Sequence, residues 1–140
     1  MADIGVLASS NCIATLEQTT ETLARPTILL VEDEVMVRWA VAEALRASDM
    51  HVVEASNAGE AIDVVMGGVR PDVLFTDIRM PGHLDGIQLA AFLEASVPNL
   101  RVIIASAYFE REDLKFRVNF VPKPYDPKSV AKTITDALRV

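Results

Sequence analysis

The stretch TILLVEDEVM, Thr27 to Met36, joins a short aliphatic run to three consecutive acids. The run Ile28 to Val31 is typical of a strand that is buried on both faces. Glu32, Asp33 and Glu34 follow at once, and adjacent like charges at the end of a core strand cost free energy. Two interpretations follow: the acids form a solvated strand end, or a cation sits among them.

From this stretch onward, strand-like and helix-like segments alternate. Because near-continuous apolar strands are buried on both faces, they predict a parallel sheet with helices on each side. Right-handed crossovers then limit the topology to a doubly wound α/β sheet, which we expect in the order 2-1-3-4-5. The expected strands are 27–33, 51–56, 71–77, 100–106 and 118–124, and the expected helices are 34–48, 57–68, 85–96 and 126–140, with room for only a short helix in 107–115.

Local signals mark several helix ends. Asn57 is expected to cap the second helix, which Gly67 and Gly68 end. Asp126 is the expected cap of the last helix, with Pro127 in its first turn. The first helix should bury one face, formed by Val37, Ala40, Val41, Ala44 and Leu45.

Composition narrows the functional class. The 140 residues suit one domain, and the net charge of −7 argues against direct binding to nucleic acid or to anionic lipid. Cys12 is the only cysteine, which excludes an internal disulfide and a cysteine-based metal cluster. No apolar run is long enough to span a membrane, and the N-terminus lacks the features of a signal peptide. We therefore expect a cytoplasmic protein without a membrane partner.

Residues 1–26 differ from the domain expected over 27–140. They are rich in Thr, Ser and Ala, and they contain no basic residue before Arg25. They are either a loosely ordered extension or a short amphipathic helix that docks on the domain or on a partner, with Ile13, Leu16, Thr20 and Leu23 at heptad-like spacing.

Polar side chains end the expected strands on one edge of the sheet. Ligands of open parallel sheets bind beyond the carboxyl ends of the strands. If strands one and three are neighbours, Glu32, Asp33 and Asp77 converge there, with Ser106 and Lys123 to one side. An all-oxygen site with few protein ligands suits Mg²⁺, or Mn²⁺. A lysine and a hydroxyl beside a carboxylate nucleophile suit an aspartyl phosphate on Asp77.

Four segments together resemble the receiver domains of two-component response regulators. They are LLVEDE (29–34), VLFTDIRMPG (73–82), VIIASAY (102–108) and FVPKPY (120–125). Each motif alone is weak, but all four in order, each at the end of its expected strand, are highly specific. The resemblance runs from about Thr27 to Val140 and implies a flavodoxin-like receiver fold.

The resemblance implies a role for each matching acid. Asp77 would be the phosphoacceptor and would also ligate the metal. Asp33 would ligate Mg²⁺ directly, Glu32 would act through a metal-bound water, and Arg79 would offer its backbone carbonyl.

The resemblance also assigns the residues around the phosphoryl group. Ser106 and Lys123 would bind it, and Ser106 and Phe120 would form the conformational switch. The peptide bond before Pro124 would be cis. Arg79 and Tyr108 occupy variable positions that we expect to tune the lifetime of the phosphoryl group.

By resemblance, the protein is a single-domain signalling switch and not an enzyme that turns over an outside substrate. A histidine kinase or a histidine phosphotransfer protein would donate the phosphoryl group, and an unknown downstream protein would read the change. No DNA-binding output is expected after the last helix. Counted with the short helix in 107–115 as the fourth and the helix in 126–140 as the fifth, the face formed by the fourth and fifth helices would bind the partner and could support a homodimer.

Two departures from the family pattern stand out. MPGHLDG, residues 80–86, is one residue longer than the common M-P-x-M-D-G, so we expect a reshaped loop. The span from Ser106 to Lys123 is shorter than usual, so the fourth helix should be shortened. His83 lies in the longer loop, and neither it nor His51 has the spacing of a metal ligand.

Two other functions remain open. A Mg²⁺-dependent phosphohydrolase also uses an aspartyl phosphate, but it usually shows an Asp-x-Asp pair after its first strand, where this chain has EDE. A receiver-like module that binds a protein without phosphorylation is the second alternative. Partner binding that is indifferent to Asp77→Asn would favour it.

Overall fold

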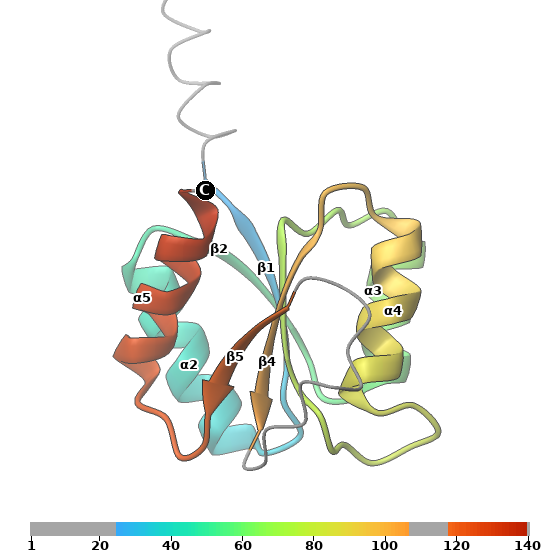
Figure 1. The fold of residues 1–140 in the computed structure, drawn as a ribbon, viewed down its shortest axis with the longest axis horizontal. Coiled ribbons are helices and arrows are strands. Elements are labelled where there is room, and N and C mark those ends of the chain that lie inside the picture. The colour runs from blue at the N-terminus through green and yellow to red at the C-terminus, as the bar shows by residue number, and fades with distance from the viewer. Residues whose placement is uncertain (1–24, 107–117, 140) are drawn as a thin grey trace, which may run out of the picture.

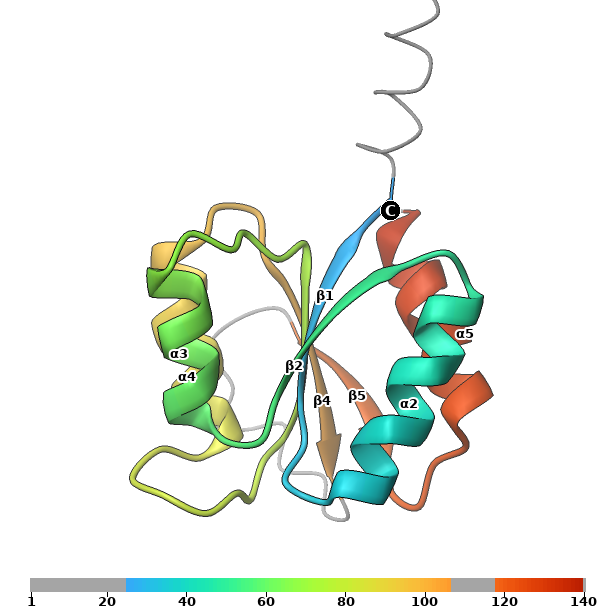
Figure 2. The same ribbon diagram turned by 180° about the vertical axis from the view of Figure 1, so that it is seen from behind.

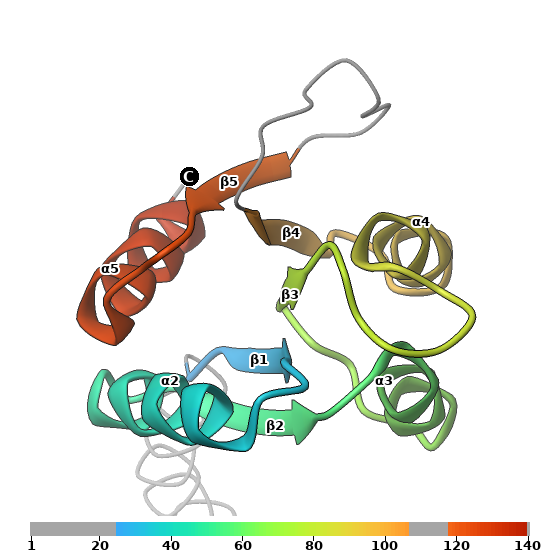
Figure 3. The same ribbon diagram turned by 90° about the horizontal axis from the view of Figure 1, so that it is seen from below.

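The computed structural model describes residues 25–106 and 118–139 as a three-layer α/β structure (Figure 1). Its elements are β1 (Thr27–Val31), α2 (Val35–Ala47), β2 (His51–Ala55), α3 (Ala58–Met66), β3 (Val73–Asp77), α4 (Gly86–Ser96), β4 (Arg101–Ser106), β5 (Val118–Pro122) and α5 (Pro127–Leu138). The five strands are parallel in the order β2-β1-β3-β4-β5, so the predicted doubly wound topology is confirmed. Helices α2 and α5 cover one face of the sheet, and α3 and α4 cover the other (Figures 2 and 3).

Alternating residues of the strands fill two separate cores. In β1, Ile28 and Leu30 face α2 and α5, whereas Leu29 and Val31 face α3 and α4, and all four are fully buried. This alternation follows from the two-residue repeat of a strand. The long apolar runs of the sequence therefore serve both faces of the sheet.

Helix α2 buries more of its surface than the predicted face. Of that face, Val41 and Leu45 are buried and the other three residues are half-buried. Ala42, which the helical pattern did not indicate, is also buried. The reason is that α2 packs against α5 as well as against the sheet.

The helix caps agree only in part with the expected ones. Asn57 caps α3 as predicted, because its side chain accepts a hydrogen bond from the backbone N–H of Glu60 at 2.9 Å. Asp126 precedes α5, but its side chain makes no capping hydrogen bond. Asp85 forms a full capping box with Gln88 at the start of α4, which the sequence reading did not predict.

Several predictions fall on residues 1–24, 107–117 and 140, outside the described part of the chain. They concern the N-terminal segment and the shortened helix predicted in 107–115, with Tyr108. They also concern the side of the expected partner and homodimer face that this short helix would form. Within the described ranges, no helix is both long enough and apolar enough to cross a membrane.

A carboxylate cluster at the carboxyl ends of β1 and β3

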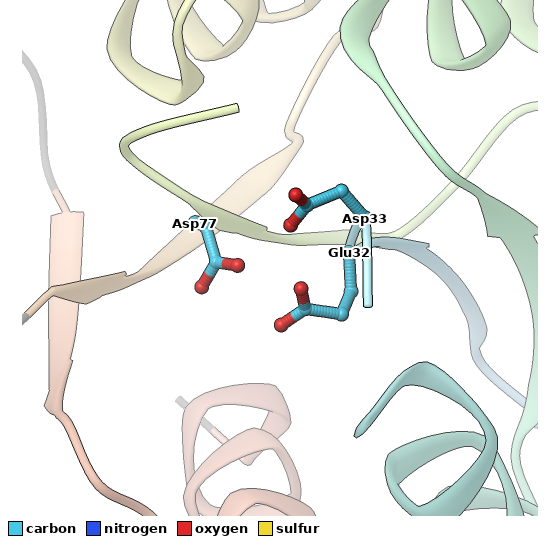
Figure 4. Close-up of side chains that lie close together, drawn as sticks. All are labelled: Glu32, Asp33 and Asp77. Carbon is cyan, nitrogen blue, oxygen red and sulfur yellow. The ribbon is translucent and has the colours of Figure 1, made fainter. Parts of the chain in front are cut away.

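Three carboxylates meet where two neighbouring strands end (Figure 4). Strands β1 and β3 pair directly, so Glu32 and Asp33, just after β1, lie beside Asp77, the last residue of β3. One oxygen from each carboxylate lies within 4.8 Å of the others. Glu32 and Asp77 are buried, at 3% and 2% exposure, while Asp33 is exposed. The predicted convergence of these acids is therefore what the fold produces.

The chain after β1 is held in place by several hydrogen bonds around Glu32. Its N–H donates to the carbonyl of Ala55, which extends the β1–β2 ladder by one bond of 3.0 Å. The Arg38 guanidinium donates to the Glu32 carbonyl at 2.7 Å and pairs with the Glu54 carboxylate at 3.4 Å. The N–H of Glu34 donates to Glu32 Oε2 at 3.0 Å. These contacts turn the Glu32 side chain inward instead of toward solvent.

A glycine allows α4 to begin against the end of β3. The N–H of Gly86 donates to the carbonyl of Ile78 at 2.6 Å. A Cβ on Gly86 would collide with the backbone carbonyl of Asp77, so a larger residue would displace either the strand end or the helix. The glycine of the MPGHLDG segment thus fixes the backbone that carries the Asp77 carboxylate.

Lys123 brings a positive charge to the cluster from the end of β5. Its Nζ lies 2.8 Å from Asp77 Oδ1. Its backbone N–H donates to the carbonyl of Ser106 at 3.0 Å, which places the buried Ser106 at the same edge of the sheet. The Lys123–Pro124 peptide bond is cis, the isomer expected at this position.

Burial and charge shift the protonation of the cluster. Burial, together with the neighbouring Asp77, raises the pKa of Glu32 from 4.5 to about 8. Partial burial alone would lower the pKa of Lys123, but the contact with Asp77 and the charges of Glu32 and Asp33 raise it above its usual value. The cluster thus holds more negative charge than one lysine compensates.

The donor set of the cluster fits a hard divalent cation. Three carboxylates provide only oxygen ligands, which Mg²⁺ and Mn²⁺ prefer. Oδ1 of Asp77 is buried, and among the described residues its one charged partner is the Lys123 ammonium at 2.8 Å. A cation would offset the negative charge of Asp77 and favour the ionised form of Glu32, which lowers the Glu32 pKa.

Two other predicted site residues lie at the margin of the cluster. Arg79 is exposed, two residues after Asp77 in the loop that leads to α4. Phe120 is half-buried on β5, paired in register with Ile104 of β4, and packs against the core on the α3 and α4 side.

Sequence reading missed two contacts of the site. The Tyr125 hydroxyl donates to Glu32 Oε1 at 3.3 Å, and Arg38 holds the Glu32 carbonyl. Tyr125 ends the FVPKPY segment, but the resemblance assigned it no role, and Arg38 lies outside the four segments. Arg38 could have been noticed as a cation on the first helix six residues after Glu32, but no sequence signal connects Tyr125 with a residue 93 positions earlier.

A family model described as "Response regulator receiver domain" matches residues 28–135. Over 132 residues, the chain is 33% identical to the sensor kinase CckA of Brucella abortus (strain 2308), covering 88% of this chain and 14% of that protein. The chain is also 31% identical over 112 residues to the DNA-binding transcriptional regulator NtrC of Escherichia coli K12, covering 74% of this chain and 23% of that protein. The chain thus spans well under two thirds of these relatives.

Solved structures agree with these matches. The receiver domain of the hybrid histidine kinase CckA is 34% identical with a TM-score of 0.69, over 80% of this chain and 98% of that one. A response regulator receiver protein from Sinorhizobium medicae WSM419 shares the fold with a TM-score of 0.75 at 24% identity, over 84% of this chain and 98% of that one. Receiver domains are signalling phosphoacceptors that interact with histidine kinases or phosphotransfer proteins, and they bind Mg²⁺ at an acidic pocket like the cluster described above. The chain therefore belongs to the family of response regulator receiver domains.

Proposed function

We propose that this protein is a phosphorylation-controlled switch whose phosphoacceptor is Asp77. The observation that carries the proposal is the buried carboxylate of Asp77, which contacts Lys123 and has an oxygen within 4.8 Å of two further carboxylates. A carboxylate in this setting can attack phosphorus while a metal ion and a lysine offset the charge. Family membership favours this function over that of a phosphohydrolase.

Each residue around Asp77 would have a distinct role in phosphoryl transfer. Asp33, Asp77 and the backbone carbonyl of Arg79 would ligate Mg²⁺, which supplies charge neutralisation when bound. Glu32 would act through a water, in keeping with the hydrogen bonds that already engage both of its oxygens. An oxygen of Asp77 forms the new P–O bond while the P–N bond of the donor's phosphohistidine breaks, and the imidazole leaves.

Lys123 and Ser106 would bind the transferred group. Lys123 already lies against Asp77, so its Nζ needs only a small shift to pair with a phosphoryl oxygen there. Ser106 ends β4 beside it and offers a hydroxyl donor. Movement of Ser106 toward the phosphoryl group would let Phe120 turn inward. Partner binding would then change through a shift between two conformations.

The surface beside the cluster supports docking of a phosphodonor protein. A hollow of about 370 Å³ opens there, lined by Glu32, Glu34, Val37, Lys123, Pro124 and Tyr125. Three large apolar side chains on α2 are exposed nearby, Val35 at 63%, Met36 at 73% and Trp39 at 58%. Exposed apolar patches bordered by polar residues often mark protein interfaces. We propose that a histidine kinase or a histidine phosphotransfer protein docks on them.

The test is the intact mass of the protein after incubation with acetyl phosphate and Mg²⁺. The wild-type chain should gain one phosphoryl group, and this gain should disappear with EDTA or in Asp77→Asn. Asp63→Asn, which changes an exposed acid on α3, should behave like the wild type. If no mass is gained with any donor and Mg²⁺ does not bind, the proposal is wrong and a phosphorylation-independent binding module becomes the better explanation.

A further inference from the structure

Tyr125 connects two loops of the site that are far apart in the sequence. It follows the Lys123–Pro124 pair after β5, and its hydroxyl donates to Oε1 of Glu32 after β1 at 3.3 Å. The loop that carries the lysine is thereby joined to the loop that carries two of the three acids.

The ring of Tyr125 is held by the core, which aims its hydroxyl. Its plane lies at 85° to the ring of Phe75, with the two centroids 5.7 Å apart, an edge-to-face contact. Phe75 is 1% exposed and lies two residues before Asp77 on β3. Tyr125 also packs against the core on the α2 and α5 side, which helps to hold its ring in place.

The hydroxyl completes the hydrogen bonding of the Glu32 carboxylate. Oε2 accepts the N–H of Glu34 at 3.0 Å, and Oε1 accepts the hydroxyl of Tyr125. With Arg38 on its backbone carbonyl, Glu32 is fixed at both ends. The backbone N–H of Glu34 is placed by the fold of the main chain and does not depend on any side chain. The phenol donor, in contrast, depends on the Tyr125 side chain alone.

We propose that Tyr125 is a positioning residue of the divalent-cation site, acting through Glu32. This inference rests on the proposed function, in which Glu32 holds a metal-bound water. A donor that fixes an outer ligand reduces the ordering needed when the cation binds, so its loss should weaken binding. Tyr125 itself touches neither the cation nor the phosphoryl group.

The experiment measures Mn²⁺ binding to the unphosphorylated full chain by electron paramagnetic resonance, with Mg²⁺ as competitor. Tyr125→Phe keeps the ring and its contact with Phe75 but removes the hydroxyl. We expect its dissociation constant to rise about three- to tenfold, as the loss of one hydrogen bond of ordinary net strength implies. Thr135→Val is the matched control, because it removes a hydroxyl that donates to the Ala131 carbonyl within α5, and it should leave the constant unchanged.

A double-mutant cycle separates a route through Glu32 from general loosening of the site. In a Glu32→Ala background, Tyr125→Phe should have no further effect on the dissociation constant, since the acceptor is gone. An unchanged or lower constant in Tyr125→Phe alone, or an equal loss in both backgrounds, would overturn the inference. Thermal melts of each variant, followed by circular dichroism, show whether it is folded.

The outcome is distinguishable from failure of the proposed function. If the wild type binds Mn²⁺ and gains a phosphoryl group on Asp77 while Tyr125→Phe binds equally well, only the role of Tyr125 is wrong. If the wild type binds no divalent cation, the proposed function fails, and the inference about Tyr125 fails with it.

Discussion

At the scale of single residues, Glu32 makes the metal-free protein sensitive to pH. Its pKa is raised from 4.5 to about 8 by burial and by Asp77. Between these values the folded chain keeps a proton on Glu32 that the unfolded chain has released, so unfolding releases a proton and a rise in pH favours it. The contribution of this carboxyl to the free energy of unfolding is therefore fully present below about pH 4.5 and is lost progressively up to about pH 8. The raised pKa of Lys123 changes the stability of the fold only above about pH 10.5, outside this window.

We predict that the melting temperature in EDTA falls as the pH rises from about 5 to about 8. Differential scanning calorimetry measures this slope. Glu32→Gln should flatten it, because the amide does not titrate, and saturating Mg²⁺ should stabilise the wild type most at the alkaline end. A slope that is the same in Glu32→Gln would show that another group dominates the pH dependence.

At the scale of elements, the acidic residues that precede α4 and α5 differ in what they contribute. Asp85 and Gln88 form a capping box at α4, whereas Asp126 precedes α5 without a side-chain hydrogen bond. We predict that Asp85→Ala lowers the free energy of unfolding by about 1 kcal/mol. Asp126→Ala should cost less than about 0.5 kcal/mol, mainly through the lost charge at the helix N-terminus. Urea titrations would measure both, and equal losses would contradict the assignment of the caps.

A second element-scale prediction concerns the start of α4. A methyl group on Gly86 would collide with the backbone of Asp77, so Gly86→Ala should destabilise the protein by about 1–3 kcal/mol. Gly59→Ala, in the first turn of α3, would meet only the end of the Asn57 side chain and should change stability by less than about 1 kcal/mol. Denaturant unfolding of the two variants, side by side, provides the comparison.

The elements themselves were largely predictable from the sequence. Aliphatic runs located all five strands, and the carboxylates at their ends located the candidate site, because parallel strands end on the same edge. Details that depend on tertiary contacts were not predictable. Ala42 is buried in the core that α2 shares with α5, and Tyr125 reaches Glu32 from the far end of the chain. A periodic pattern reports which face of an element is apolar, but not which distant side chain completes a hydrogen bond.

At the scale of the whole molecule, one sheet separates two cores that should unfold together. Leu29 and Leu30 are neighbours on β1, both fully buried, and they face opposite cores. We predict that Leu29→Ala and Leu30→Ala each lower the free energy of unfolding by about 2–5 kcal/mol. In each variant, unfolding should remain a single transition with a lower midpoint. Fluorescence of Trp39 on α2 and far-ultraviolet circular dichroism should report the same midpoint in each variant. Separate midpoints would mean that the two faces of the sheet unfold independently.

The direction of the strands has a practical consequence for building fusions. The start of β1 and the end of α5 lie together at the edge of the sheet opposite the carboxylates (Figure 1). A fluorescent protein or an affinity handle joined before residue 25 or after residue 139 would therefore leave the molecule on the side away from Asp77. A reporter attached directly before β1 or after α5 should leave the acidic edge open to a docking protein, and these two points lie together, which suits a circular permutant of residues 25–139 (Figure 1).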